Sequence, residues 1–179
     1  MEPSSTPPPL PPSPSPAAPV PPATTAPDHV PPPAPAKQPE PNPFEGNYKL
    51  IKSENGQHYL KKIGVGLLAR KIGDPNKAII DLKYNKATDT YYAKISIGSR
   101  SKELRFKIGV IFDEDTIDGR HCKTVFTRKN SHILIQEQRW KGKLSIITYE
   151  FKGDKVFATL KADDVTATQV YQKLNKLTG

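Results

Sequence analysis

Apolar and polar residues alternate along most of the chain from Phe44 onward, at the two-residue period of a β-strand with one buried face. Residues 44–51 form the first such run. Clusters of turn-forming residues, such as Lys141-Gly142, separate the later runs. These later runs centre on Ile79, Tyr92, Leu104, Ile111, Val125, Leu134, Ile146, Phe157 and Val170. About ten strands with short connections predict an antiparallel meander, which removes its exposed edges by closing into a barrel.

A different pattern follows the first predicted strand. Between His58 and Ile72 the apolar residues recur at three- and four-residue steps, which is the spacing of an amphipathic helix. Gly64 and Gly66 interrupt this run, and residues 53–55 offer a helix N-cap. The segment is therefore predicted to form two short helices joined by a tight turn.

Proline marks a second region at the N-terminus. Of the 20 prolines, 19 fall within residues 1–43, and no aromatic residue precedes Phe44. Segments rich in proline, alanine and serine bury too little apolar surface to offset the entropy lost on ordering. We therefore predict a disordered tail over residues 1–43 and one folded domain over residues 44–179.

The tail carries one motif with a recognition mechanism. Residues 32–37 read Pro-Pro-Ala-Pro-Ala-Lys, which places a cation two residues after the second proline of a Pro-x-x-Pro spacing. SH3 domains bind such segments through aromatic grooves for the prolines and an acidic pocket for the cation. Residues 32–37 are thus a candidate site for an SH3-type partner. The alternative is a semi-rigid spacer in which the spacing arises by chance from composition.

Charge and cysteine content restrict the partners and the compartment. The formal net charge is +9, and the charges are scattered, which favours solvated strand faces over a nucleic-acid groove. Cys122 is the only cysteine, so no intrachain disulfide can form and a reducing compartment is expected. No signal-peptide pattern and no run of 18 apolar residues occur. We expect a cytoplasmic monomer without a nucleic-acid partner.

The residues give little support to an enzyme. His58, His121 and His132 are dispersed, and no Cys/His spacing matches a metal site. A lone cysteine such as Cys122 is more often a packed small residue than a nucleophile. We therefore expect no catalytic residue, no bound metal and no cofactor.

Polar residues also fall on strand faces opposite the outward Lys and Glu positions. Within each strand they share parity: Gln169 with Tyr171; Ser145 with Ile147 and Tyr149; Leu134 with Gln136 and Gln138; Asp118 with Arg120 and Cys122. A barrel of ten strands is wide enough to hold a cavity in which such groups anchor a ligand or ordered water. The alternative is that these residues face solvent.

A series of short motifs runs in order along residues 44–174. It begins with Phe44-Glu45-Gly46-Asn47-Tyr48-Lys49-Leu50, continues through Asp118-Gly119-Arg120 and Gln138-Arg139-Trp140-Lys141-Gly142, and ends with Gln169-Val170-Tyr171-Gln172-Lys173. These motifs resemble those of the cytosolic fatty-acid-binding proteins. The resemblance implies a mainly β fold of the calycin or lipocalin-like kind, a ten-stranded antiparallel up-and-down barrel with a helix-turn-helix lid. It also implies one hydrophobic ligand in a partly water-filled interior.

The chain departs from this family at the ligand head group. The resemblance implies a carboxylate clamp of two arginines and a tyrosine; the tyrosine is Tyr171, but Gln169 and Tyr149 stand at the arginine positions. Arg120, paired with Asp118, is the remaining candidate for an interior cation. The candidate ligand-binding residues are Tyr149, Gln169, Tyr171, Arg120 and Gln138. We expect neutral lipids to be tolerated almost as well as free acids.

The function expected from the resemblance is intracellular binding and transport of a long-chain fatty acid or related hydrophobic ligand. The alternatives are a carrier of a neutral lipid or retinoid, or an interaction protein that docks through its tail and uses the barrel as a lipid sensor. Lys61, Lys62, Arg70 and Lys71 flank the predicted helices and are candidates for transient contact with an anionic membrane. They are equally compatible with ordinary solubilising charge. In the members of this family that enter the nucleus, a similar basic cluster, here Lys61, Arg70 and Lys71, acts as a conformational import signal, which makes the nucleus a second candidate location.

Overall fold

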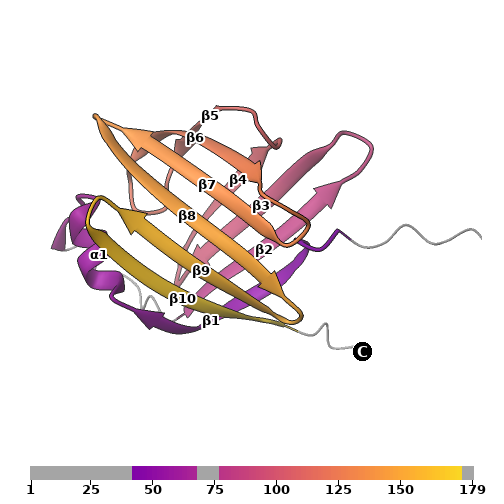
Figure 1. Ribbon diagram of the computed structural model, residues 1–179, viewed down its shortest axis with the longest axis horizontal. Coiled ribbons are helices and arrows are strands. Elements are labelled where there is room, and N and C mark those ends of the chain that lie inside the picture. Colours follow the sequence, from indigo (N-terminus) through magenta and orange to yellow (C-terminus); the bar gives the residue numbers. More distant parts are fainter. Residues whose placement is uncertain (1–41, 68–76, 175–179) are drawn as a thin grey trace, which may run out of the picture. The chain divides into compact units, whose positions relative to one another are not determined.

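The computed structural model describes residues 42–67 and 77–174. Within these residues the chain forms one helix and ten strands (Figure 1). The elements are β1 (Gly46–Glu54), α1 (Gly56–Lys62), β2 (Ala78–Asn85), β3 (Thr90–Ile97), β4 (Arg100–Phe106), β5 (Phe112–Asp115), β6 (His121–Arg128), β7 (Ile133–Trp140), β8 (Lys143–Lys152), β9 (Lys155–Ala162) and β10 (Val165–Lys173).

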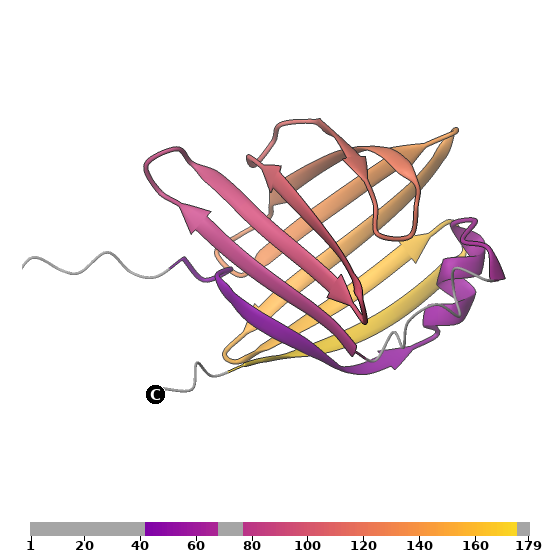
Figure 2. The ribbon, with the colours of Figure 1, turned by 180° about the vertical axis from the view of Figure 1, so that it is seen from behind.

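The ten strands form one antiparallel sheet in the order β4-β3-β2-β1-β10-β9-β8-β7-β6-β5. Consecutive strands pair with each other everywhere except between β4 and β5, and β1 also pairs with β10, which joins the two halves of the meander. The sheet therefore curls into the predicted barrel, as the two opposite views show (Figures 1 and 2). Tight hairpins make this possible: Lys141 and Gly142 both have positive φ, 44° and 73°, as a two-residue turn matched to the strand twist requires.

Closure of the barrel is incomplete at β4 and β5, the two ends of the sheet. The described residues contain no strand pairing between these two elements. Aromatic side chains fill the gap instead: the ring of Phe106 stacks on that of Phe126 with centroids 3.8 Å apart, and on that of Phe112 at 6.3 Å. The edge that the meander leaves open is thus covered from inside by packed rings.

The strand predicted around Ile111 is misplaced. Residues 107–111 form the connection between β4 and β5, and the short strand starts at Phe112. Gly109 has φ 76° and donates its backbone N–H to Phe126 O at 2.7 Å, which turns the chain at this point. Ile111 is consequently 67% exposed.

The helix α1 packs against β9 and β10 at one end of the barrel (Figure 1). Asn55 precedes it as predicted, with φ 58°, but its side chain makes no capping hydrogen bond. The Asn55 amide instead donates to Thr166 O at 2.7 Å, and Lys62 forms an ion pair of 2.6 Å with Asp164. These contacts tie α1 to β10 and to the turn before it. The second predicted helix lies outside the described residues.

The opposite end of the barrel is closed by Phe44. This side chain is fully buried, and its ring meets that of Phe151 edge-on at 4.9 Å. Tyr91 links the same region to Asn42 and to β6, because its hydroxyl oxygen accepts hydrogen bonds from Asn42 Nδ2 at 2.9 Å and from Arg128 Nη2 at 3.0 Å. The chain is therefore held against the barrel before β1 begins.

The inward strand faces carry the polar residues that the alternation placed there. Ser145, Gln136, Gln138 and Cys122 are all at most 4% exposed, so they do not face solvent. Asp118 and Arg120 differ from the expectation, because both lie in the turn between β5 and β6 rather than on a strand. Alternation along a strand therefore does not determine where these two side chains point.

Candidate functional site

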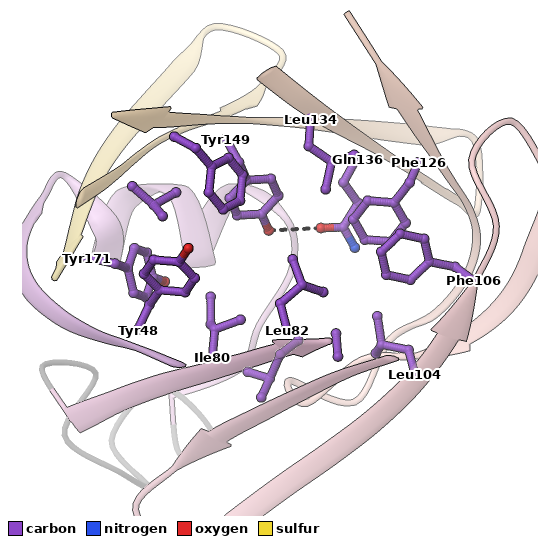
Figure 3. A pocket seen from close by; sticks show the side chains of 14 residues that line it. Tyr48, Ile80, Leu82, Leu104, Phe106, Phe126, Leu134, Gln136, Tyr149 and Tyr171 are labelled. Carbon is purple, nitrogen blue, oxygen red and sulfur yellow. Dashed lines mark hydrogen bonds between the residues drawn. The ribbon is translucent and has the colours of Figure 1, made fainter. Parts of the chain in front are cut away.

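A cavity lies inside the barrel, surrounded by side chains from its strands (Figure 3). It contains about 550 Å³ of space free of protein atoms, including the part that opens to solvent. Most of its wall is apolar, contributed by aliphatic and aromatic side chains, and the polar part is confined to Gln136 and three tyrosine hydroxyls. The lining residues are Tyr48, Ile80, Leu82, Ala93, Ile95, Leu104, Phe106, Phe126, Leu134, Gln136, Tyr149, Phe151, Val156 and Tyr171.

Tyr171 and Gln169 form the first polar group of the cavity. Tyr171 extends from β10, is 6% exposed, and donates its hydroxyl to Gln169 Oε1 at 2.9 Å. Burial raises the pKa of the Tyr171 hydroxyl well above its ordinary value, so it remains protonated at neutral pH. The pair is consequently neutral where the family pattern has a cation.

Tyr149 belongs to a second polar group. Its hydroxyl donates to Gln136 Oε1 at 3.0 Å, and Gln136 Nε2 donates in turn to Glu114 Oε2 at 3.2 Å. Burial raises the pKa of Tyr149 well above its usual range, and the neighbouring Tyr171 and the charge of Glu114 raise it further. Tyr149 is therefore a protonated donor whose oxygen lies at the cavity wall.

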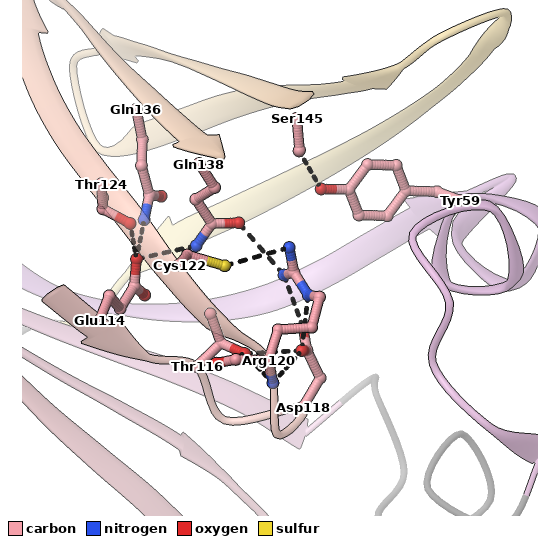
Figure 4. Close-up of polar contacts among 10 residues, drawn as sticks. All are labelled: Tyr59, Glu114, Thr116, Asp118, Arg120, Cys122, Thr124, Gln136, Gln138 and Ser145. Atoms are coloured by element: carbon pink, nitrogen blue, oxygen red, sulfur yellow. Dashed lines mark hydrogen bonds and ion pairs between the residues drawn. The ribbon is translucent and has the colours of Figure 1, made fainter. Parts of the chain in front are cut away.

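Glu114 is the acceptor on which this second group converges (Figure 4). The side chain projects inward from β5 and is 5% exposed. Its Oε2 accepts from Thr124 Oγ1 at 2.6 Å and from Gln138 Nε2 at 2.9 Å, in addition to Gln136. Three neutral donors thus compensate a buried carboxylate, as its desolvation demands.

Arg120 is held by its neighbours rather than presented to the cavity (Figure 4). Its Nε and Nη2 donate to the two carboxylate oxygens of Asp118, each at 2.8 Å, and Nη2 also donates to Gln138 Oε1 at 3.1 Å. The guanidinium lies 4.5 Å above the Trp140 ring. Burial alone would raise the pKa of the Asp118 carboxyl, but the hydrogen bonds and charge of Arg120 outweigh it and lower this pKa below its ordinary value.

The five predicted ligand-binding residues thus occupy three different settings. Tyr149 and Tyr171 line the cavity, and Gln169 is bonded to Tyr171. Gln138 and Arg120 are absent from the described lining and belong to the bonded group beside it. Among the described residues no cluster of three or more His, Cys, Asp or Glu side chains is arranged to hold a metal ion.

Two polar residues of this region were missed as site residues by the sequence reasoning. Gln136 lines the cavity, and its parity with Gln138 was a usable signal. Glu114 gave no such signal, because the misplacement of its short strand left its direction undefined.

A groove beneath α1 adjoins the cavity. It is lined by residues of α1, β2, β3, β9 and β10, and it shares Ile95 and Tyr171 with the cavity wall. At its side Tyr59 of α1 and Ser145 of β8 share a hydrogen bond of 2.6 Å between their hydroxyls (Figure 4). The groove is therefore the candidate route by which a ligand reaches the interior, next to a helix that is bonded to the barrel wall.

Comparison with known proteins decides the family. No family model matches the chain. Cellular retinoic acid-binding protein 2 of Mus musculus is 38% identical over 134 residues, covering 72% of this chain and 96% of that protein. Fatty acid-binding protein 5 of Pygoscelis papua is 35% identical over 130 residues, covering 73% of this chain and 96% of that protein. The chain belongs to this family of fatty-acid- and retinoic acid-binding proteins.

Solved structures agree with the family in the shape of the barrel. A fatty acid binding protein of Schistosoma mansoni, in complex with arachidonic acid, superimposes with a TM-score of 0.68 at 29% identity, covering 74% of this chain and 97% of that one. The family membership confirms the resemblance drawn from the motifs. In this chain the pair Tyr171–Gln169 and the hydroxyl of Tyr149 are both uncharged.

Proposed function

We propose that the protein binds one long-chain fatty acid or related lipid in the interior cavity and carries it through the cell. The observation that supports this most is the apolar wall of the cavity, which has a volume of about 550 Å³ including the part that opens to solvent, with a polar group at Tyr149 and Tyr171. The relatives described above are named as binding proteins. The chain is accordingly a lipid carrier and not an enzyme.

The energetics of the site fit a lipid with a long hydrocarbon tail. Leu82, Leu104 and Phe106 offer the tail an apolar surface, and burial stabilises the complex by about 25 cal/mol for each Å² of apolar area removed from water. We propose that the head group lies near Tyr149 and Tyr171, because their hydroxyls, together with Gln136 and the hydroxyl of Tyr48, are the polar groups of the wall. Gln169 is within one hydrogen bond of this position.

Filling the cavity from within tests this function. Ala93 lines the cavity on β3, and Ala93→Trp places an indole in the space assigned to the ligand. We expect isothermal titration of the delipidated wild type with oleyl alcohol to show one site per chain, and Ala93→Trp to weaken the affinity at least about tenfold. Thr166→Trp, at an exposed position on β10, is the control and is expected to leave the affinity unchanged. Unchanged affinity in a folded Ala93→Trp variant would contradict an interior site.

A neutral lipid or a retinoid is the second candidate ligand. It is favoured by the hydrogen bond between Tyr171 and Gln169, which puts uncharged groups where the family pattern has cations. A retinoid also agrees with the name of the relative from Mus musculus, a cellular retinoic acid-binding protein. Titration with retinol and with oleyl alcohol compares a retinoid tail with a straight hydrocarbon tail. Both ligands end in a primary hydroxyl, so a difference in affinity comes from the tail.

For the N-terminal region we propose an extended tail over residues 1–43, joined to a lipid-binding domain over residues 44–179. Residues 32–37 are its candidate site for an SH3-type partner. Capture of SH3 domains by the full chain should be lost in Lys37→Glu, whereas Lys155→Glu on the barrel should have no effect. Equal capture by both variants would favour the alternative, in which the tail is a semi-rigid spacer.

Membrane contact is proposed for the region of α1. Lys61 is exposed, whereas the Lys62 ammonium is paired with Asp164 at 2.6 Å and with Asp163 at 3.5 Å. Arg70 and Lys71 lie outside the described residues. Lipid transfer from the monomeric protein to anionic vesicles should slow when Lys61, Arg70 and Lys71 are changed to Glu, and an unchanged rate at low salt would contradict the proposal. The same variant tests entry into the nucleus, because it removes the candidate import signal.

A further inference from the structure

The interior carries one carboxylate that is not neutralised by a cation. Asp118 is paired with Arg120, but no Lys, Arg or His of the described residues lies within ion-pair distance of Glu114. All three hydrogen bonds to Glu114 converge on Oε2, and Oε1 has no hydrogen-bond partner within residues 42–67 and 77–174. The polar side of the barrel therefore contains one guanidinium and two carboxylates.

The hydrogen-bond directions around Glu114 follow from its carboxylate, which only accepts, and at Gln138 also from Arg120. A guanidinium only donates, so Gln138 turns its carbonyl to Arg120 and its amide to Glu114. Gln136 likewise gives its amide to Glu114, and its carbonyl therefore accepts the hydroxyl of Tyr149. The Tyr149 proton is thus used within the protein, and what Tyr149 offers a ligand is an oxygen lone pair.

Tyr171 is in the same situation, because its hydroxyl donates to Gln169 Oε1 at 2.9 Å. The polar groups at this side of the cavity consequently include two phenolic oxygens that accept, and the carboxylate of Glu114 lies behind them, bonded to the lining residue Gln136. A ligand carboxylate has only acceptors and a negative charge, so it meets lone pairs and the field of Glu114. A hydroxyl or a primary amide can donate to these oxygens and accept from the amide hydrogens of Gln169, which have no hydrogen-bond partner within residues 42–67 and 77–174.

We infer that the cavity selects lipids whose head group is uncharged and donates a hydrogen bond, such as a primary alcohol or primary amide, over lipids that end in a carboxylate. This selectivity rests on the proposed lipid-binding function and assigns Glu114 a new role. Glu114 determines head-group specificity through Gln136 and through its charge. The increase in the pKa of Tyr149 caused by Glu114 agrees with this role, since the charge reaches the cavity wall.

The test compares oleyl alcohol with oleate, which share one hydrocarbon tail. Isothermal titration of the full chain at neutral pH should show the alcohol bound at least about tenfold more tightly than the acid. In Glu114→Gln, which keeps the shape but removes the charge, the preference should fall to within about threefold, mainly because oleate gains affinity. Glu137→Gln removes the same charge from the outer face of β7 and should keep the preference of the wild type.

The possible results distinguish head-group selectivity from the proposed lipid binding itself. If both probes bind but oleate is preferred in the wild type, or the ratio is the same in Glu114→Gln, the inference is wrong and lipid binding stands. Binding of neither probe would overturn the proposed function and the inference together.

A second measurement needs only the wild type and does not depend on the folding of a variant. Oleyl methyl ether keeps the oxygen of oleyl alcohol but has no proton to donate. We expect the ether to bind about tenfold more weakly than the alcohol, and equal affinities would overturn the requirement for a donor.

Discussion

Replacing Arg120 by glutamine is expected to lower the free energy of unfolding by about 3 kcal/mol, because it leaves Asp118 without its cation in a largely buried turn. The side chains of Arg120 and Asp118 are 11% and 17% exposed, and two hydrogen bonds of 2.8 Å join them. Arg120→Lys keeps the charge but loses the two-pronged geometry and the contact with Trp140, so we expect an intermediate loss. Urea unfolding of the three proteins at neutral pH measures the difference.

The loss in Arg120→Gln should depend on pH. In the folded protein the pKa of Asp118 is lowered relative to the unfolded chain, so the ion pair contributes stability above about pH 4 and loses it as the pH falls through the folded pKa. The stabilities of wild type and Arg120→Gln should therefore converge in acid. Because Arg120 is not among the described residues that line the cavity, the affinity for oleyl alcohol should change by less than about threefold. A large loss of affinity without loss of stability would instead make Arg120 a ligand-binding residue.

Phe44→Ala is expected to destabilise the barrel by about 3–5 kcal/mol. Phe44 is fully buried, packs edge-on against Phe151, and has the Arg128 guanidinium 4.8 Å above its ring. Its removal leaves a void at the closed end of the barrel and frees the chain that Asn42 holds to Tyr91. Thermal and urea unfolding measure the cost.

Phe157→Ala on the outer face of β9 is the matched control for Phe44→Ala. Phe157 is 38% exposed, and we expect its truncation to cost less than about 1 kcal/mol. Equal losses in the two variants would show that the closed end of the barrel contributes no more to stability than its outer wall.

Most of the fold was predictable because each strand buries one face. Along β9 the side chains alternate strictly between exposed and buried, and the sequence Lys155–Ala162 shows the same alternation except at Phe157, an apolar residue on the outer face. Phe112–Asp115 could not be placed, because a strand of four residues has too few positions for a period. The strand was predicted around Ile111 because Val110 and Ile111 are apolar. In the structure these two residues lie in the connection between β4 and β5 and are 52% and 67% exposed.

The site was predictable only as far as strand parity and the family pattern reach. Tyr171 and Tyr149 follow from both, and they line the cavity. Arg120 shares the parity of Cys122 but lies in a turn, where alternation no longer sets the direction of a side chain. The hydrogen bonds that join Glu114 to Gln136 and Gln138 connect residues more than 20 positions apart, and only the folded register of β5, β6 and β7 brings them together.

The most direct test of the central claim is the position of a bound lipid in a crystal of the full chain. An octadecanol carrying two bromine atoms at the middle of its chain marks the tail by anomalous scattering. We expect the bromine signal inside the cavity, between Leu82 and Leu104, with the hydroxyl within hydrogen-bond distance of Tyr149 or Tyr171. Bromine found on the outer face of the barrel, with the cavity free of lipid, would contradict an interior lipid-binding site.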